Sequence, residues 1–258
     1  MAKLSDFFIF EDDQQKKQEI KKWKNSRWLF VDTETTGLPK KDKTESQAEP
    51  FIVQLGYCVV EDMKVVKTFN QLIDPGQDIE IDPGASAVTG IDRDRINKGK
   101  NAGEVKTFEE IASDFAKEIS QADVVMAYNA KFDKPVIERE FKLANVKVQQ
   151  KPWLDPMIWV MKHLVLPNHK LPTVAQHYKI SLEHAHDAGA DAKAAAEVTM
   201  AFVQTFDGLP DDPEEVVKLQ GVWDSELKAA RIAAWKKKKV EQPKESVDRF
   251  SHSKIVKR

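Results

Sequence analysis

The stretch WLFVDTETTGL, residues 28 to 38, places two acids directly after four apolar residues. A run of apolar residues is typical of a strand buried inside a sheet. Alternate side chains of a strand point to the same face, so Asp32 and Glu34 would project side by side. Two desolvated carboxylates repel each other unless a cation lies between them. The alternative is that the strand has ended and both acids are solvated in a loop.

A second acid lies beside a predicted strand end. In YNAKFDKPVIERE, residues 128 to 140, we expect a strand to end at Asn129 and a helix to begin near Lys134 and Pro135, because proline is tolerated in a first helical turn. Asp133 would immediately precede that helix. Aspartate is a preferred helix cap, so capping alone would also explain this residue.

The third acid lies on the apolar face of a predicted helix. HAHDAGADAKAAAEVTMAF, residues 184 to 202, belongs to a helix expected from about Asp187 to Phe206. Asp191 shares one face with the two alanines, the valine and the phenylalanine that lie three, four, seven and eleven positions later. A cap at Asp187 does not require an acid on that face. His186 precedes the helix, where a histidine can equally be a surface or capping residue.

The rest of the chain predicts an α/β sheet of mixed direction. Phe51 to Val60 and Val65 to Ile73 are β-rich runs joined by a tight turn, as in an antiparallel meander. Residues 74 to 103 are rich in Asp, Pro and Gly, and we expect mostly loop with one short helical turn. Thr107 and Glu110 form a capping box that opens the next helix.

Length and composition bound the class of protein. The chain has 258 residues, 41% of them hydrophobic, which is enough for one sizeable domain or two small ones. Cys58 is the single cysteine, so a disulfide framework and a CxxC zinc site are excluded and a reducing, cytoplasmic setting is expected. The sequence has neither a run of roughly 18 apolar residues nor a secretory signal, so we expect a soluble protein without a membrane partner.

The distribution of charge and a Pro-, Gly- and Asp-rich linker divide the chain into three expected parts. Residues 1 to 26 are an N-terminal arm, residues 27 to 207 a folded domain, and residues 208 to 258 a linker and a basic C-terminal extension, helical or disordered. The net charge is −2, but residues 221 to 258 hold 11 Lys and Arg against 5 acids, so +6 lies there and −8 on the remainder. Such an acidic body does not attract a polyanion without cations or a local basic patch.

The three acidic segments together resemble the DEDDh branch of the DnaQ-like 3′→5′ exonucleases, which includes proofreading subunits and RNase T. FVDTETTGL at 30 to 38 is similar to the first family motif, NAKFD at 129 to 133 to the second, and HDAGADA at 186 to 192 to the third. The order and spacing of the motifs also agree. Tyr128 departs from the histidine that often stands there, but no catalytic group is lost. The resemblance implies a ribonuclease-H-like fold, a five-stranded mixed sheet flanked by helices.

The same resemblance implies the residues of the site. Two Mg²⁺ or Mn²⁺ ions would be held by four carboxylates, which are hard oxygen ligands: Asp32, Glu34, Asp133 and Asp191. His186 would accept the proton of the attacking water. Thr35, Gly37 and Leu38 would line the pocket of the 3′-terminal nucleotide, and Asn129 would contact the substrate or brace the second motif.

The implied activity is removal of 5′-mononucleotides from the 3′ end of DNA or RNA by two-metal-ion hydrolysis. The implied partner is nucleic acid with a free, single-stranded 3′ end, and a polymerase or a second copy of the chain is a further candidate. Two alternatives stay open. One is a catalytically silent nuclease-like module that binds nucleic acid or tethers a polymerase, and the other is a cation-binding α/β protein unrelated to nucleases.

The C-terminal extension allows two interpretations. Trp223, Leu227, Ile232 and Trp235 would form an amphipathic helix for a partner, with the lysines at 236 to 239 along a nucleic acid backbone. A solvated, partly disordered extension explains the composition equally well. If the extension is an accessory, its deletion from residue 208 onward should leave cleavage of short oligonucleotides intact.

Overall fold

The computed structural model describes residues 23–39, 50–183 and 185–241. Most of the predicted N-terminal arm, His184 and the end of the basic extension lie outside the described residues. The strands are β1 Trp28–Thr35, β2 Ile52–Glu61, β3 Lys64–Ile73, β4 Val105–Lys106, β5 Val124–Met126 and β6 Trp153–Leu154. The helices are η1 Trp23–Asn25, α3 Pro83–Thr89, α4 Arg93–Ala102, α5 Phe108–Gln121, α6 Ala130–Leu143, α7 Pro156–His163, α8 Leu171–His177, α9 Ala188–Thr205 and α10 Pro213–Glu241. None of these helices is both long and apolar enough to cross a membrane.

The strands form one mixed sheet in the order β4-β3-β2-β1-β5-β6. β2 pairs antiparallel with β1 and β3, whereas β5 runs parallel to β1. The predicted mixed α/β sheet and its antiparallel meander are confirmed. The sheet has six strands where five were expected. Its two edge strands, β4 and β6, are only two residues long. Strands this short show no alternation in the sequence that would reveal them.

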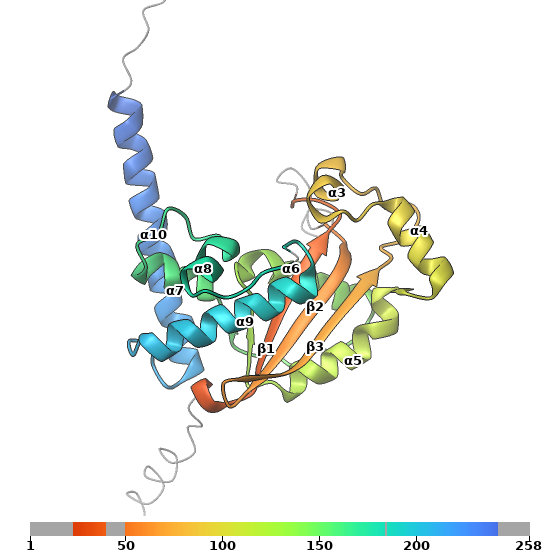
Figure 1. The fold of residues 1–258 in the computed structure, drawn as a ribbon, viewed down its shortest axis with the longest axis horizontal. Coiled ribbons are helices and arrows are strands. Elements are labelled where there is room, and N and C mark those ends of the chain that lie inside the picture. The colour runs from red at the N-terminus through yellow and green to blue at the C-terminus, as the bar shows by residue number, and fades with distance from the viewer. Residues whose placement is uncertain (1–22, 40–49, 184, 242–258) are drawn as a thin grey trace, which may run out of the picture.

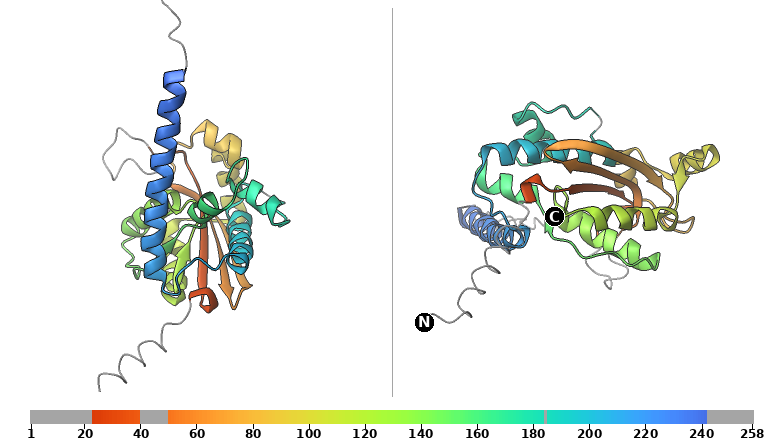
Figure 2. Two further views of the ribbon diagram at one scale, coloured as in Figure 1. Left: turned by 90° about the vertical axis from the view of Figure 1, so that its left-hand side faces the viewer. Right: turned by 90° about the horizontal axis from the view of Figure 1, so that it is seen from below.

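Helices cover both faces of the sheet, as Figure 2 shows with α9 on one side and α5 and α6 on the other. β1 explains the arrangement, because its side chains alternate between two cores. Trp28 and Phe30 are buried in the core on the α9 side, and Leu29 and Val31 in the core under α5 and α6. A strand buried on both faces is apolar throughout, which is the pattern of residues 28 to 31.

The expectation of a mostly irregular segment between residues 74 and 103 is wrong. α3 and α4 occupy most of it, and the residues that suggested loop are the caps of these helices. Asp82 and Asp92 accept hydrogen bonds from the main-chain N–H groups of the first turns, and Gly90 and Gly103 end the helices in the left-handed conformation. Asp, Pro and Gly therefore mark the ends of two short helices here.

The described part of the C-terminal extension is mostly helical, and the first half of α10 is part of the folded body. Val216 and Trp223 of α10 are buried in the core on the α9 side, together with Leu209 of the preceding segment. The side chain of Gln220 hydrogen-bonds to the main chain of Trp153 in β6 and of Asp155 just after it. The second half of α10 projects beyond the body (Figure 1). The domain boundary at residue 208 stays a prediction, and these contacts favour a boundary inside α10.

Candidate active site

The first two predicted acids lie where β1 loses a neighbour. β5 pairs only with Trp28 to Phe30 of β1, whereas β1 continues to Thr35. Asp32 and Glu34 therefore belong to a strand, half-buried on the face that α9 covers. The alternative in which these acids are solvated loop residues is wrong. The end of β5 leaves the edge of β1 open beside them.

Asp133 fills that open edge and does not cap a helix. α6 begins at Ala130, so Asp133 lies inside its first turn. Asp155 accepts hydrogen bonds from the main-chain N–H groups of Asn129 (3.0 Å) and Ala130 (3.1 Å) at the start of the helix. Oδ1 of the buried Asp133 instead accepts from the main-chain N–H and the hydroxyl of Thr33, at 2.9 and 2.8 Å. The capping interpretation of Asp133 is therefore wrong, and its carboxylate bonds to β1 where β5 has ended.

Asp191 and His186 approach Glu34 from the start of α9. Each of these three residues offers a ligand atom, and the three atoms lie within 4.8 Å of one another. The main-chain N–H of His186 donates to Oδ2 of Asp191 at 3.0 Å, whereas Oδ1 of Asp191 is buried with no hydrogen-bond partner. The His186 ring is exposed, and its main chain is left-handed, with φ of 69°. A buried oxygen without a partner, surrounded by further acids, fits a divalent cation.

Gly56 positions α9 over these acids, and the sequence interpretation missed it. Gly56 of β2 is the register partner of Asp32. A Cβ at Gly56 would lie 2.1 Å from the main-chain carbonyl atoms of Ala188, so the start of α9 rests directly on β2. Gln54 and Asn70 of the same sheet donate hydrogen bonds to the cap residue Asp187. A glycine inside an apolar strand is the signal of such a close approach.

The environment raises the pKa of all four predicted metal ligands. Burial, followed by the charges of the other acids, raises the pKa of Asp32 well above its ordinary value and that of Glu34 to about 8. Burial raises the pKa of Asp133 to about 7, although the hydrogen bonds from Thr33 oppose the shift. Burial also raises the pKa of Asp191, against the bond from His186. Crowded carboxylates of this kind favour either a proton or a cation between them.

The residues predicted to contact substrate differ in what they expose. Thr35 is buried and its hydroxyl donates to the carbonyl of Gly37 at 2.7 Å, so its side chain is already engaged within the fold. Leu38 is 77% exposed just beyond this turn. Asn129 has φ of 85°, and its side-chain oxygen is buried without a hydrogen-bond partner. Leu38 is therefore accessible to a ligand, whereas the side-chain oxygen of Asn129 is not.

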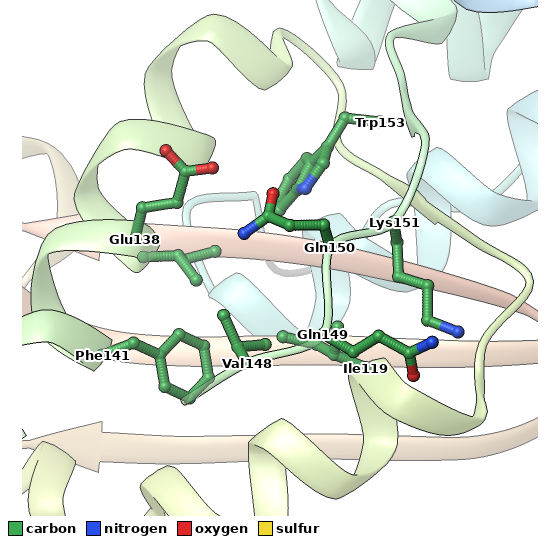
Figure 3. A pocket seen from close by; sticks show the side chains of 9 residues that line it. Ile119, Glu138, Phe141, Val148, Gln149, Gln150, Lys151 and Trp153 are labelled. Atoms are coloured by element: carbon green, nitrogen blue, oxygen red, sulfur yellow. The ribbon is translucent and has the colours of Figure 1, made fainter. Parts of the chain in front are cut away.

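A separate pocket, on the side of the sheet that α5 and α6 cover, has a different character. Its cavity volume is only about 20 Å³, and it is lined by Ile119, Phe141, Val148 and Trp153 among others, as Figure 3 shows. Its charged residues, Glu138 and Lys151, are of opposite sign. None of the five predicted catalytic residues lines this pocket. The cluster of acids at the end of β1 is therefore the stronger candidate for chemistry.

Comparisons with known proteins identify the family of the chain. A family model described as exonuclease (RNase T) matches residues 29–199, a range that holds all three motifs. The 3′-5′ exonuclease DinG of Staphylococcus saprophyticus is 30% identical over 186 residues, which cover 72% of this chain and 19% of that protein. The PolC-type DNA polymerase III of Caldanaerobacter subterraneus is 30% identical over 179 residues, 69% of this chain and 12% of that protein. The chain spans a fifth or less of the length of these relatives.

Among solved structures, exonuclease X in complex with 5′ overhanging duplex DNA has a similar fold. The TM-score is 0.55 at 19% identity, and the match covers 74% of this chain and 99% of that chain. A similarity at this identity shows that the arrangement of sheet and helices is shared.

Proposed function

Since the chain belongs to the exonuclease family whose model spans residues 29–199, we propose that it removes 5′-mononucleotides from the 3′ end of nucleic acid. The family predicted from the three motifs is confirmed. The observation that carries the proposed activity is the convergence of Asp32, Glu34, Asp133 and Asp191 at the open edge of β1. Three separate elements supply these acids, and neither the loop role considered for Asp32 and Glu34 nor the capping role considered for Asp133 occurs.

Divalent cations are proposed as the cofactor, two per site, as Mg²⁺ or Mn²⁺. Asp32, Glu34, Asp133 and Asp191 would hold them, and the unpartnered Oδ1 of Asp191 supports this role. When bound, such a pair of cations stabilises the charge that develops on the attacking and leaving oxygens of a phosphodiester displacement. The protein contributes a rigid set of ligands, because Asp133 is fixed to β1 by Thr33 and Asp191 by the main chain of His186.

His186 is proposed to accept the proton of the attacking water at a ring nitrogen. Its ring lies beside the carboxylates of Glu34 and Asp191 and is exposed to solvent, so water and substrate can reach it. An imidazole is suited to proton transfer near neutral pH. The bond from its main chain to Asp191 couples the position of the histidine to that of a metal ligand.

The substrate is proposed to be a nucleic acid with a single-stranded 3′ end. Leu38 offers exposed apolar surface for the terminal base or sugar. Gly37 would contact the substrate through its main chain, and a Cβ there would already lie 3.3 Å from the Cβ of Asp82. Because the side-chain oxygen of Asn129 is buried, this residue would brace the second motif, the second of the two roles expected for it. Thr35 would take part through its main chain. DNA is the first polymer to test, because the matched relatives are named as a 3′-5′ exonuclease and a DNA polymerase. A polymerase or a second copy of the chain as partner stays a prediction.

A cleavage assay with a matched pair of variants tests the proposal. Single-stranded DNA and RNA labelled at the 5′ end are incubated with Mg²⁺, Mn²⁺ or EDTA, and we expect stepwise shortening that EDTA abolishes. Asp133→Asn removes a proposed metal ligand, whereas Glu138→Gln makes the same chemical change on an exposed residue of the same helix, α6. Only Asp133→Asn should abolish cleavage. Intact activity in Asp133→Asn, or no cleavage of either polymer by the unaltered protein, would exclude the proposed mechanism.

The catalytically silent module is the alternative that the same assay addresses. A binding module gains nothing from an acid cluster in which burial and neighbouring charges raise the pKa of Asp32 and Glu34, because this crowding only costs stability. The geometry therefore favours the enzyme.

A further inference from the structure

The projecting half of α10 carries one face of cations and large apolar side chains. Lys228, Arg231, Ile232, Trp235 and Lys236 are spaced at i, i+3, i+4, i+7 and i+8, so they lie on one side of the helix. Ile232 is 55% and Trp235 59% exposed. Within the described residues, Arg231 and Lys236 have no acidic partner. These five residues are the basic face of α10.

The basic face is not the side by which α10 joins the body. Trp223 marks the docked side, since it is buried and its ring contacts the ring of His163 on α7. At 100° per residue, Lys228 lies about 140° around the helix axis from Trp223. From residue 227 to 240 the sequence has six lysines and arginines and no acid. The projecting half of the helix therefore concentrates positive charge, of which Lys228 pairs with Asp224 on the same helix.

We propose that the basic face of α10 binds the single-stranded part of the nucleic acid whose 3′ end lies at the acids, and this inference rests on the proposed function. Cations neutralise phosphates and an aromatic ring stacks on bases without sequence preference, which is the chemistry needed to hold a single strand. The body bears net negative charge and offers a polyanion little attraction away from the metal site. In Figure 1 both β1 and α10 run towards the same end of the molecule, so the projecting half lies on the side of the acids.

The composition of the face favours nucleic acid over a lipid surface. An interfacial membrane helix needs a broad apolar face, and here only Ile232 and Trp235 are large and apolar, with cations on both sides. The basic face therefore fits phosphates and bases alternating along a strand.

Binding without catalysis isolates this surface. In EDTA the acids repel the nucleic acid, so the affinity for a labelled single strand of about 30 nucleotides reports contacts away from the acids. A strand of about 4 nucleotides is the comparison, because it is too short to reach both the acids and α10. Trp235→Ala should weaken binding of the long strand about tenfold through loss of stacking. Arg231→Ala with Lys236→Ala should weaken it similarly and reduce the slope of log affinity against log salt by about 1.4.

The control variant carries the same change of charge elsewhere. Lys117→Ala with Lys142→Ala removes two exposed lysines from α5 and α6 and should leave binding of the long strand within about twofold of the unaltered protein. With Mg²⁺ present, the variants of the basic face should raise KM for the long strand only, with kcat and cleavage of the short strand unchanged.

The outcomes separate the two proposals. If the short strand is cleaved but the basic-face variants bind the long strand as tightly as the control, the inference about α10 is wrong and the proposed function stands. If neither strand is cleaved but the variants still lose binding in EDTA, α10 binds nucleic acid and the proposed function is wrong. If the protein binds anionic phospholipid vesicles through Trp235 and binds neither strand, the inference is overturned in favour of a membrane surface.

Discussion

At the scale of single residues, hydrogen bonds separate the acids that shape the fold from those free to bind a ligand. Asp187 and Asp191 lie four residues apart at the start of α9. Burial alone would raise the pKa of Asp187, but bonds from Asn70, Ala190 and Gln54 hold it below its ordinary value. Asp191 accepts one bond and its pKa is raised. The satisfied acid caps the helix, and the unsatisfied one is available to a cation.

Replacement of His186 tests its role as a base. The left-handed main chain at this position is easier for asparagine than for most residues, so His186→Asn removes the imidazole with little strain. We expect kcat to fall about 10²- to 10⁴-fold. Binding of Mn²⁺ should be retained, as measured by the increase in Tm when the cation is added. Loss of activity in His184→Ala instead, with His186→Asn active, would show that the third motif is misaligned.

Gly56→Ala tests the close approach of α9 to β2. The added Cβ would overlap the main chain of Ala188, so α9 must shift away from Asp32. We expect a loss of about 1–3 kcal/mol in the free energy of unfolding, measured by urea denaturation, and a large loss of cleavage. Gly221→Ala is the matched control, because nothing lies within 4 Å of a Cβ there and alanine favours the interior of α10. Equal effects of the two substitutions would contradict this view of Gly56.

At the scale of elements, α10 serves both as part of the core and as a projecting arm. Gln220 joins it to the main chain beside Asp155, and Asp155 in turn bonds the first N–H groups of α6, the helix that holds Asp133. The first half of α10 thus supports the element that carries one of the proposed ligands. Deletion from residue 208 onward was expected to leave cleavage intact if the extension is an accessory, and these contacts argue against that condition for the first half of α10.

Two truncations distinguish the halves of α10. Deletion of residues 208 to 258 removes the buried side chains of Leu209, Val216 and Trp223, and loss of one large buried residue costs about 3–5 kcal/mol. We expect Tm to fall by roughly 10 °C or more and cleavage to be lost on warming. Deletion of residues 228 to 258 leaves these side chains in place, so Tm and cleavage of short oligonucleotides should stay close to those of the full chain. Equal stability of the two truncations would argue against a docked first half.

At the scale of the whole molecule, the acids make stability depend on pH and metal. The pKa of Glu34 is about 8 in the fold against an ordinary value of 4.5, so the folded chain binds more protons than the unfolded chain between these values. In EDTA, the contribution of Glu34 to the free energy of unfolding is therefore fully present below about pH 4.5 and is lost as the pH rises through 8. Asp133, with a pKa of about 7, acts in the same direction.

Thermal unfolding at two pH values checks this prediction. In EDTA, Glu34→Gln should reduce the fall in Tm between pH 6 and pH 8, because its side chain no longer ionises. Saturating Mn²⁺ should raise Tm by about 5 °C or more, and by more at pH 8 than at pH 6, since the cation binds ionised carboxylates. A larger metal effect at pH 6 would show that the acids are not the ligands.

The sequence by itself determined the family and the central strand, and it identified the acids as candidates. Apolar runs and cap residues are local signals, so β1, α5 and α9 lie where the pattern predicted them. The order of the three motifs added what no single motif contained, because Asp32, Glu34 and Asp133 each had a structural explanation when taken alone.

Only the tertiary structure decided which of those explanations hold. Whether Asp133 caps a helix depends on Asp155, 22 positions later in the chain and adjacent only after folding. The roles of Gly56 and of the first half of α10 likewise arise from contacts between distant segments. Hydrogen bonding, burial and charge repulsion act between neighbours in space, and a sequence read along the chain contains only the neighbours in order.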